Sequence, residues 1–359
     1  MHIFPQNYMV MVKCLTYNHC SYIEDTMNGF CFQKTFFPYV CTIIDDCSTD
    51  GEQSIIRKYL EKNFDLKESI SQEETKDFIS LLVRHRVNKN CFFFVVFLKY
   101  NHYRIKKKKQ IYIDSIQKQV KYIAFCEGDD YWVDKEKLQK QISYLETHPC
   151  YSLSHSNFFV YEEFSHHLFT TDTVEKKVAQ MHEKFTPIDV FEGYRIRTLT
   201  VVVRKSCYEK AKLIDPFLFS GYFLMGDSQL WYLLAKMGKI HFLRDRTSVR
   251  RIVPNSATQK KNIKQNLRFS LSCAEMYMYI ASKDFIPPKY YEKLKVSYSN
   301  ALFRYMLFDN KFKPLFPLDL SLVDKNLLRL SKFHLAKLKI LLSFKMNDLK
   351  KFIKRFMKK

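Results

Sequence analysis

Residues 39–51 read YVCTIIDDCSTDG, an apolar run that ends directly in acidic and small polar residues. The run Tyr39–Ile44 is short, continuously apolar and rich in β-branched side chains, which predicts a buried strand. Residues 48–50 (STD) are types preferred at the start of a helix, and apolar residues between 55 and 60 then repeat at helical spacing. The stretch predicts a strand, an acidic loop with Asp45 and Asp46, and a helix.

A second stretch of the same kind covers residues 122–132, which read YIAFCEGDDYW. Tyr122–Cys126 predicts another buried strand, and it ends in the acidic residues Glu127, Asp129 and Asp130. Apolar residues at positions 138, 142 and 145 then predict a helix that follows this loop. Two strand–loop–helix units with acidic loops are therefore expected.

Strand and helix patterns alternate over about the first 150 residues, which predicts an α/β fold with a Rossmann-like, mostly parallel sheet flanked by helices. Residues 61–90 are polar and give no clear prediction. Further strands are expected at Met9–Thr16, Phe92–Leu98, Ser152–Tyr161, Thr198–Arg204 and Ile240–Leu243, and further helices at Tyr22–Gln33, Lys106–Val120 and from Asp227 to Gly238.

The pattern becomes helical and basic beyond about residue 260. We therefore predict one domain over residues 1–260, with halves of about 1–150 and 151–260, and a basic helical region over 261–359. The tail from Lys325 interleaves lysines with apolar residues, as in amphipathic helices that lie on anionic membranes. The alternative is a helical cap packed on the domain with solvated lysines.

The two acidic loops each follow a predicted strand. Carboxyl ends of parallel strands form the edge where α/β sheets bind ligands, so the two loops are candidates for one shared site. Clustered carboxylates repel one another unless a cation lies among them, and Mg²⁺ and Mn²⁺ prefer such oxygens. The alternative is that Asp, Asn and Gly only form turns after the strands.

These motifs, in this order, resemble the family 2 glycosyltransferases of bacterial surface-polysaccharide pathways. The resemblance covers roughly residues 9–260. It rests on Leu15-Thr16-Tyr17-Asn18, on Ile44–Gly51, on Ala124–Trp132, on Gly226-Asp227 with Leu230-Trp231, and on Val249-Arg250-Arg251.

The resemblance implies a GT-A type fold, with a nucleotide-sugar half in 1–150 and an acceptor half in 151–260. It also implies an inverting, metal-dependent transfer of a sugar from a nucleotide-diphosphate sugar to a glycan or lipid-linked saccharide. It implies Mn²⁺ or Mg²⁺ as the cofactor. The implied donor contacts are Thr16, Tyr17, Asp45, Asp46, Asp129 and Arg251, the implied metal ligands are Glu127, Asp129 and Asp130, and the implied catalytic base is Asp227.

Several of these residues also allow a simpler interpretation. Asp227 is a suitable helix N-cap, and Arg251 fits a basic surface loop. The lysine run 106–109 precedes the fourth strand, where such enzymes often contact the donor, but it also fits a solvated face. Trp132 and Trp231 suit either sugar stacking or core packing. The sequence departs from the family pattern at Cys47, where Gly is usual, and at Glu127, where Asp is commoner.

Lys and Arg outnumber Asp and Glu by 59 to 37, a net charge of +22, which favours anionic partners. A basic nucleic-acid-binding protein is the main alternative, but no helix-turn-helix, zinc-finger or RNP-type pattern is present, so we expect no nucleic-acid partner. A catalytically silent relative would be expected to have lost a carboxylate from the metal loop or at Asp227, and none is lost.

The ten cysteines form no Cys-x-x-Cys pair, and the first residues lack the pattern of a secretory signal. The longest apolar run, Cys91–Leu98, is too short to span a bilayer. We therefore expect a cytoplasmic protein that is peripheral at the inner face of the cell membrane.

Overall fold

The computed structural model describes residues 7–67, 69, 71–170, 185–192, 196–253, 262–309 and 311–329. The chain divides into two compact units. The first comprises Met1–Ile214 and Leu230–Pro254, and the second comprises Asp215–Gln229 and Asn255–Lys359. The second unit thus includes residues 215–229, which lie inside the acceptor half expected from the sequence.

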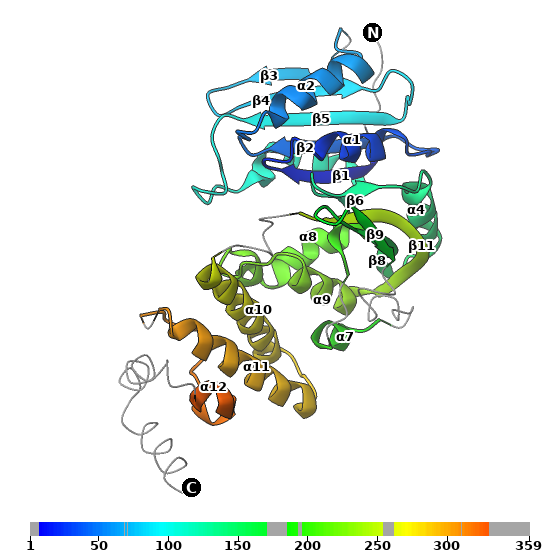
Figure 1. The fold of residues 1–359 in the computed structure, drawn as a ribbon. Coiled ribbons are helices and arrows are strands. Elements are labelled where there is room, and N and C mark those ends of the chain that lie inside the picture. The colour runs from blue at the N-terminus through cyan, green and yellow to red at the C-terminus, as the bar shows by residue number, and fades with distance from the viewer. Residues whose placement is uncertain are drawn as a thin grey trace, which may run out of the picture. The chain divides into compact units, whose positions relative to one another are not determined.

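The first unit is built on one mixed sheet whose central strands are parallel, as the sequence predicts (Figure 1). The strand order is β3-β4-β5-β2-β1-β6-β10-β8-β11-β7, with β9 paired to β8. The strands are β1 (Tyr8–Thr16), β2 (Tyr39–Asp45), β3 (Ser71–Glu74), β4 (Phe78–Arg84), β5 (Cys91–Leu98), β6 (Val120–Phe125), β7 (Tyr131–Trp132), β8 (Tyr151–Glu162), β9 (His167–Thr170), β10 (Val202–Arg204) and β11 (Lys239–Ile252).

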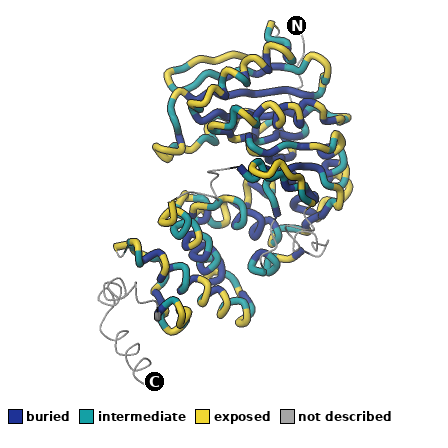
Figure 2. Tube along the Cα trace, viewed as in Figure 1, coloured by how far each residue is buried: buried dark blue, intermediate teal, exposed yellow. Residues whose placement is uncertain are grey.

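Helices cover both faces of this sheet, so β2 and β5 are buried throughout and read as continuous apolar runs (Figure 2). One face packs on α1 (Ile23–Cys31), α2 (Glu52–Asn63) and α4 (Lys137–Thr147). Elements toward the other face include η1 (Lys109–Tyr112), α3 (Asp114–Lys118), α8 (Lys205–Ile214) and α9 (Ser228–Met237), where Tyr208 and Trp231 pack against Phe125. The remaining short elements are α7 (Pro187–Phe191) and η2 (Thr198–Thr200).

The second unit is helical. Its long helices α10 (Ile263–Lys283) and α11 (Pro288–Met306) pack together, and Ser272 Oγ accepts a hydrogen bond from Leu224 N at 2.8 Å. That bond ties residues 215–229 to α10. The short elements of this unit are η3 (Pro216–Phe219), η4 (Leu320–Leu322) and α12 (Lys325–Arg329).

Two parts of the chain differ from the sequence-based expectation, and a third had no clear prediction. The helix predicted over Lys106–Val120 is wrong: Lys106 has a left-handed backbone (φ 55°), and only η1 and α3 are helical. The strand predicted at Thr198–Arg204 begins as η2 and is extended only in β10. β3 and β4 pair within residues 61–90, where β3 is exposed and β4 is only partly buried, so the sequence shows no clear apolar pattern.

Most of the basic tail, residues 330–359, lies outside the described residues. Within the described part of the chain, no helix is both long and apolar enough to cross a bilayer. All ten cysteines are free thiols.

Candidate active site

Three carboxylates gather in the loop that follows β6. Glu127, Asp129 and Asp130 each offer an oxygen, and these oxygens lie within 4.8 Å of one another. Glu127 is exposed and Asp130 is buried, so the cluster runs from the surface into the unit. The structure therefore brings together the three residues that the sequence identifies as candidate metal ligands.

The loop after β6 that carries Glu127, Asp129 and Asp130, called the acidic loop from here on, is held tightly against the end of β1. Gly128 N donates to Leu15 O at 3.1 Å, and a Cβ on Gly128 would lie 2.1 Å from Thr16 Oγ1. Thr26 Oγ1, on α1, is close to Gly128 O at 3.0 Å and to Asp130 O at 2.7 Å. Only glycine fits at position 128, because the loop backbone packs directly on the Thr16 side chain.

Asp130 is the most deeply placed of the three carboxylates. Its Oδ1 accepts a hydrogen bond from Arg251 N at 2.8 Å. Burial, together with the negative charges of Asp129 and Glu127, raises the pKa of Asp130 well above its usual range. A divalent cation among these carboxylates would reverse that shift, because positive charge favours the ionised form.

Arg251, on β11, clamps the acidic loop to α1. Its guanidinium forms ion pairs with Asp25 and with Glu163 (3.0 Å), and Nη1 donates to Asp129 O at 3.2 Å. It also lies over the Tyr131 ring, 4.4 Å from its centroid. Sequence reasoning missed this network, since no local pattern links residues 25, 163 and 251.

The loops after β1 and β2 interlock beside the acidic loop. Asn18 N donates to Ser48 Oγ at 2.9 Å, and Thr49 N donates to Asn18 Oδ1 at 2.8 Å. Thr16 Oγ1 donates to Glu52, which also accepts from His19 N at 2.9 Å. Thr16 therefore lies between the acidic loop and the β2 loop, and it fixes one to the other.

Glu52 is a buried carboxylate of this site that sequence reasoning did not single out. It also accepts a hydrogen bond from Ser48 Oγ at 2.8 Å, and its burial raises its pKa. The spacing Thr49-x-x-Glu52 matches a capping box and could have drawn attention to it. In the structure Glu52 instead turns toward the end of β1.

Asp45 ends β2 and is fully buried. Its Oδ1 accepts from Ser48 N at 3.1 Å and from Gln53, whereas Oδ2 has no hydrogen-bond partner among the described residues. Burial raises the pKa of Asp45. A buried acceptor without a partner is costly, so this oxygen is poised to accept a hydrogen bond from a ligand.

Asp46, its neighbour, is differently engaged. Its carboxylate accepts from His102 N at 2.7 Å and from Tyr103 N at 3.1 Å, and it forms an ion pair with Lys109 at 2.8 Å. Both oxygens therefore hold the segment that follows β5. The sequence suggests one role for both residues, but in the structure the Asp46 carboxylate holds the segment after β5, and the Asp45 carboxylate accepts hydrogen bonds from the loop and helix that follow β2.

Cys47 has a backbone φ of 61°, in the left-handed region that favours glycine. This accounts for the usual Gly at this position in the family pattern. Burial, followed by the charges of Asp45 and Asp46, raises the pKa of the Cys47 thiol.

The other candidate residues are placed as follows. Tyr17 is half-buried in the turn after β1. Trp132 and Trp231 are buried, and Trp132 Nε1 donates to Leu199 O at 3.0 Å, so both belong to the core. Asp227 belongs to the second unit and accepts a hydrogen bond from Ser228 N at 2.7 Å, directly before α9.

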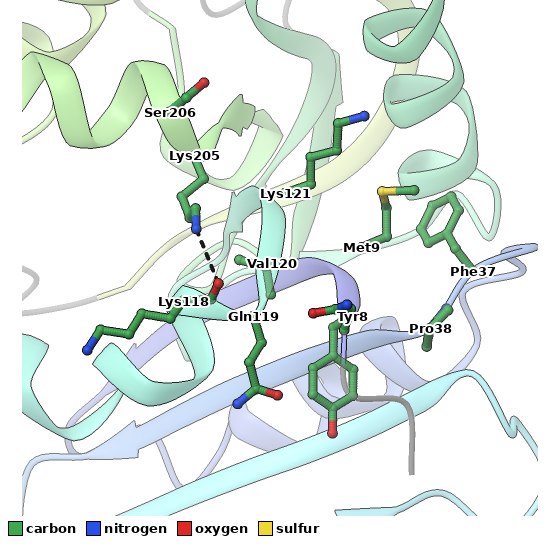
Figure 3. A pocket seen from close by; sticks show the side chains of 11 residues that line it. Tyr8, Met9, Phe37, Pro38, Lys118, Gln119, Val120, Lys121, Lys205 and Ser206 are labelled. Carbon is green, nitrogen blue, oxygen red and sulfur yellow. Dashed lines mark hydrogen bonds between the residues drawn. The ribbon is translucent and has the colours of Figure 1, made fainter. Parts of the chain in front are cut away.

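A pocket of about 470 Å³ lies at the opposite edge of the sheet, where β1 and β6 begin (Figure 3). Lys118, Lys121 and Lys205 line it, and Lys205 Nζ donates to Lys118 O at 3.3 Å. The acidic cluster is not part of this pocket. Ligands of open α/β sheets bind at the carboxyl edge, so this pocket is a poor candidate for the active site.

No protein-family model matches the sequence. An uncharacterized protein of Mycobacterium tuberculosis is 30% identical over 138 residues, which are 38% of this chain and 32% of that protein. TuaG of Bacillus subtilis, named for a glycosyltransferase role in teichuronic acid biosynthesis, is 28% identical over 147 residues, 40% of this chain and 45% of TuaG. The matched segments thus span less than half the length of these relatives.

S. aureus TarS, solved with UDP-GlcNAc, superimposes with a TM-score of 0.52 at 14% identity, over 95% of this chain and 89% of the TarS chain. The chain has the GT-A type of glycosyltransferase fold. This confirms the α/β class and the fold expected from the sequence. Within the GT-A type fold of this chain, the acidic loop follows β6 at the carboxyl edge of the parallel strands.

Proposed function

We propose that this protein is an inverting, metal-dependent glycosyltransferase that moves a sugar from a nucleotide-diphosphate sugar to a glycan or lipid-linked saccharide in surface-polysaccharide synthesis. One observation carries the proposal. The carboxylate cluster and Asp45 Oδ2, which has no hydrogen-bond partner in the described part of the chain, flank Thr16 at one edge of the sheet. The fold shared with TarS, which was solved with UDP-GlcNAc, supports a nucleotide-sugar donor.

The donor set suits Mn²⁺ or Mg²⁺, which take carboxylate oxygens together with phosphate oxygens. Glu127, Asp129 and Asp130 would hold the ion. When bound, the ion neutralises charge that develops on the leaving diphosphate. Arg251 holds the acidic loop in place through two hydrogen bonds. Its guanidinium donates to Asp129 O, and its backbone N–H donates to the Asp130 carboxylate.

The loops after β1 and β2 would hold the nucleoside part of the donor. Asp45 Oδ2 is buried and free to accept an N–H or O–H of the base or ribose. Thr16 is paired with Asp45 across β1 and β2, and Tyr17 follows it in the turn. Asp46 would act indirectly in this proposal, by fixing the segment after β5.

Asp227 is our proposed catalytic base, which takes the proton of the acceptor hydroxyl as it attacks the anomeric carbon. One displacement of this kind inverts the configuration of the sugar. Proton NMR of the product, from a donor of known anomeric configuration, would detect the inversion. Retained configuration would contradict this part of the proposal.

Asp130→Ala is expected to abolish both Mn²⁺ binding and sugar transfer, because it removes the deepest ligand of the cluster. The test is a thermal-shift screen of UDP-, GDP- and dTDP-sugars with Mn²⁺, followed by a transfer or donor-hydrolysis assay. Asp114→Ala, which removes an exposed carboxylate on α3, is the charge-matched control. Tight binding of duplex nucleic acid without a response to any nucleotide sugar would overturn the proposal.

We further propose that the protein works at the cytoplasmic face of the cell membrane, where a lipid-linked acceptor would be presented. The support is the basic composition and the amphipathic pattern of the tail from Lys325.

A further inference from the structure

The segment that follows β5 and includes η1 reverses the usual distribution of side chains. In this basic loop, residues 100–112, several polar residues point inward and the apolar ones are exposed. Tyr103 is 73% exposed, Ile105 58% and Ile111 57%. His102, by contrast, is fully buried.

The inner side of the basic loop is anchored by specific contacts. His102 hydrogen-bonds to Tyr100 O at 2.9 Å and to Tyr112 Oη at 2.8 Å, and it stacks on the Tyr100 ring. Lys107 pairs with Asp77 at 3.1 Å. Together with the contacts to Asp46, these interactions fix the backbone of the loop. The outer side chains are therefore held in exposed positions by the folded structure.

The outer side combines apolar and cationic groups. Arg104, Lys106 and Lys108 are exposed, and within the described ranges no ion pair engages them. Exposed Ile and Tyr side chains flanked by Lys and Arg match the chemistry of a lipid-water interface, where the rings and aliphatic groups enter and the cations meet anionic headgroups.

A second exposed apolar group, Phe36 (96% exposed) and Val87 (84% exposed), lies beside a cavity of about 940 Å³. Five amide side chains line this cavity, and its two charged lining residues, Lys34 and Glu136, are of opposite sign. The lining therefore has no formal net charge that would select an anionic partner. It therefore serves as a control rather than as a candidate.

We propose that the basic loop is a docking surface for anionic lipid membranes, independent of the tail beyond residue 329. Charge complementarity selects the partner, and the three exposed apolar side chains favour a lipid surface over a purely charged polymer. If the proposed function holds, this docking would bring the edge of the sheet that carries Asp46 toward membrane-borne acceptors.

The test is flotation of the full chain with vesicles of phosphatidylcholine containing phosphatidylglycerol, compared with pure phosphatidylcholine. Tyr103→Ser/Ile105→Ser/Ile111→Ser keeps the net charge and is expected to weaken binding to anionic vesicles by at least about tenfold. Arg104→Gln/Lys106→Gln/Lys108→Gln is expected to lose roughly fivefold for each charge removed. Phe36→Ser/Val87→Ser is the matched control and should bind as the wild type does.

Hydrogen–deuterium exchange separates this loop from the tail. Bound vesicles should slow exchange across residues 100–112. Unchanged exchange there, or unchanged binding by both loop variants, would overturn the proposal. Protection of the loop by RNA but not by vesicles would overturn it as well. None of these measurements depends on transferase activity, so the proposed function can fail while the docking surface stands.

Discussion

At the scale of single residues, Lys137 is the most unusual group near the site. It is fully buried at the start of α4, where Nζ donates to Gln141 Oε1 at 2.5 Å and to Thr200 O at 3.0 Å. Its amine also lies 5.0 Å from the Trp132 ring centroid. Burial lowers the pKa of Lys137 to about 7. Its two hydrogen-bond acceptors are neutral and do not fully replace water around a charged amine, and the charge of Asp134 opposes the shift only in part.

This pKa gives a testable pH dependence of stability. Between about pH 7 and the ordinary lysine value near 10.4, the unfolded chain keeps a proton that the folded chain has lost. The free energy of unfolding should therefore rise with pH across this window, by up to about 1.4 kcal/mol per pH unit from this group. Urea denaturation of wild type and Lys137→Met at several pH values measures the difference.

The free energy of unfolding of Lys137→Met should not show this rise with pH. Lys58 is an exposed lysine on α2, so Lys58→Met should show the same rise as the wild type. Parallel curves for the wild type and Lys137→Met would show that the buried amine keeps an ordinary pKa.

Cys47 provides a second prediction at this scale. A left-handed backbone costs a residue with a Cβ about 1 kcal/mol relative to glycine. Cys47→Gly is therefore expected to raise the free energy of unfolding by a few tenths to about 1 kcal/mol, while Cys47→Val should lower it, because a β-branched side chain tolerates this φ poorly. The midpoints of denaturant unfolding of the two variants and the wild type measure these changes. A Cys47→Gly variant less stable than the wild type would indicate that packing of the thiol stabilises the fold by more than the backbone conformation costs.

At the scale of elements, the acidic loop depends on its close contact with β1. Gly128→Ala should displace the loop, because the added Cβ would overlap Thr16 Oγ1 and the Thr16 Cβ, 2.6 Å away. We expect a loss of about 1–3 kcal/mol of stability and Mn²⁺ binding weakened at least about tenfold. Calorimetric titration with Mn²⁺ measures the second effect.

Gly226→Ala is the control for stability and metal binding, since an added Cβ there meets nothing within 4 Å. If both variants bound Mn²⁺ like the wild type, close packing of the loop on Thr16 would not be what orders the carboxylates.

At the scale of the whole molecule, cation and donor should stabilise the fold cooperatively. The carboxylates of the acidic loop repel one another without a cation, and a donor diphosphate would complete its coordination. The rise in Tm with Mn²⁺ and a matching nucleoside diphosphate together should exceed the sum of the separate rises. A nucleoside without phosphates should show no such excess, and an additive response to the diphosphate would argue against a shared site.

The sequence by itself determined the strand–loop–helix units and the positions of the acidic residues, because apolar periodicity and turn-forming residues act locally. Hence β1, β2, β5 and β6 were predicted within a residue or two. The residues of the acidic loop were also found, since their chemistry is visible without coordinates.

Only the tertiary structure decided what these residues do for one another. It leaves an oxygen of Asp45 open while the neighbouring Asp46 is fully engaged by residues 102, 103 and 109. It also joins Arg251 to Asp25 and Glu163. Where the sequence predicts a helix over Lys106–Val120, only η1 and α3 are helical, and the apolar side chains of Ile105 and Ile111 are exposed. Contacts between residues so distant in the chain depend on how strands pair and helices pack, which local spacing does not encode.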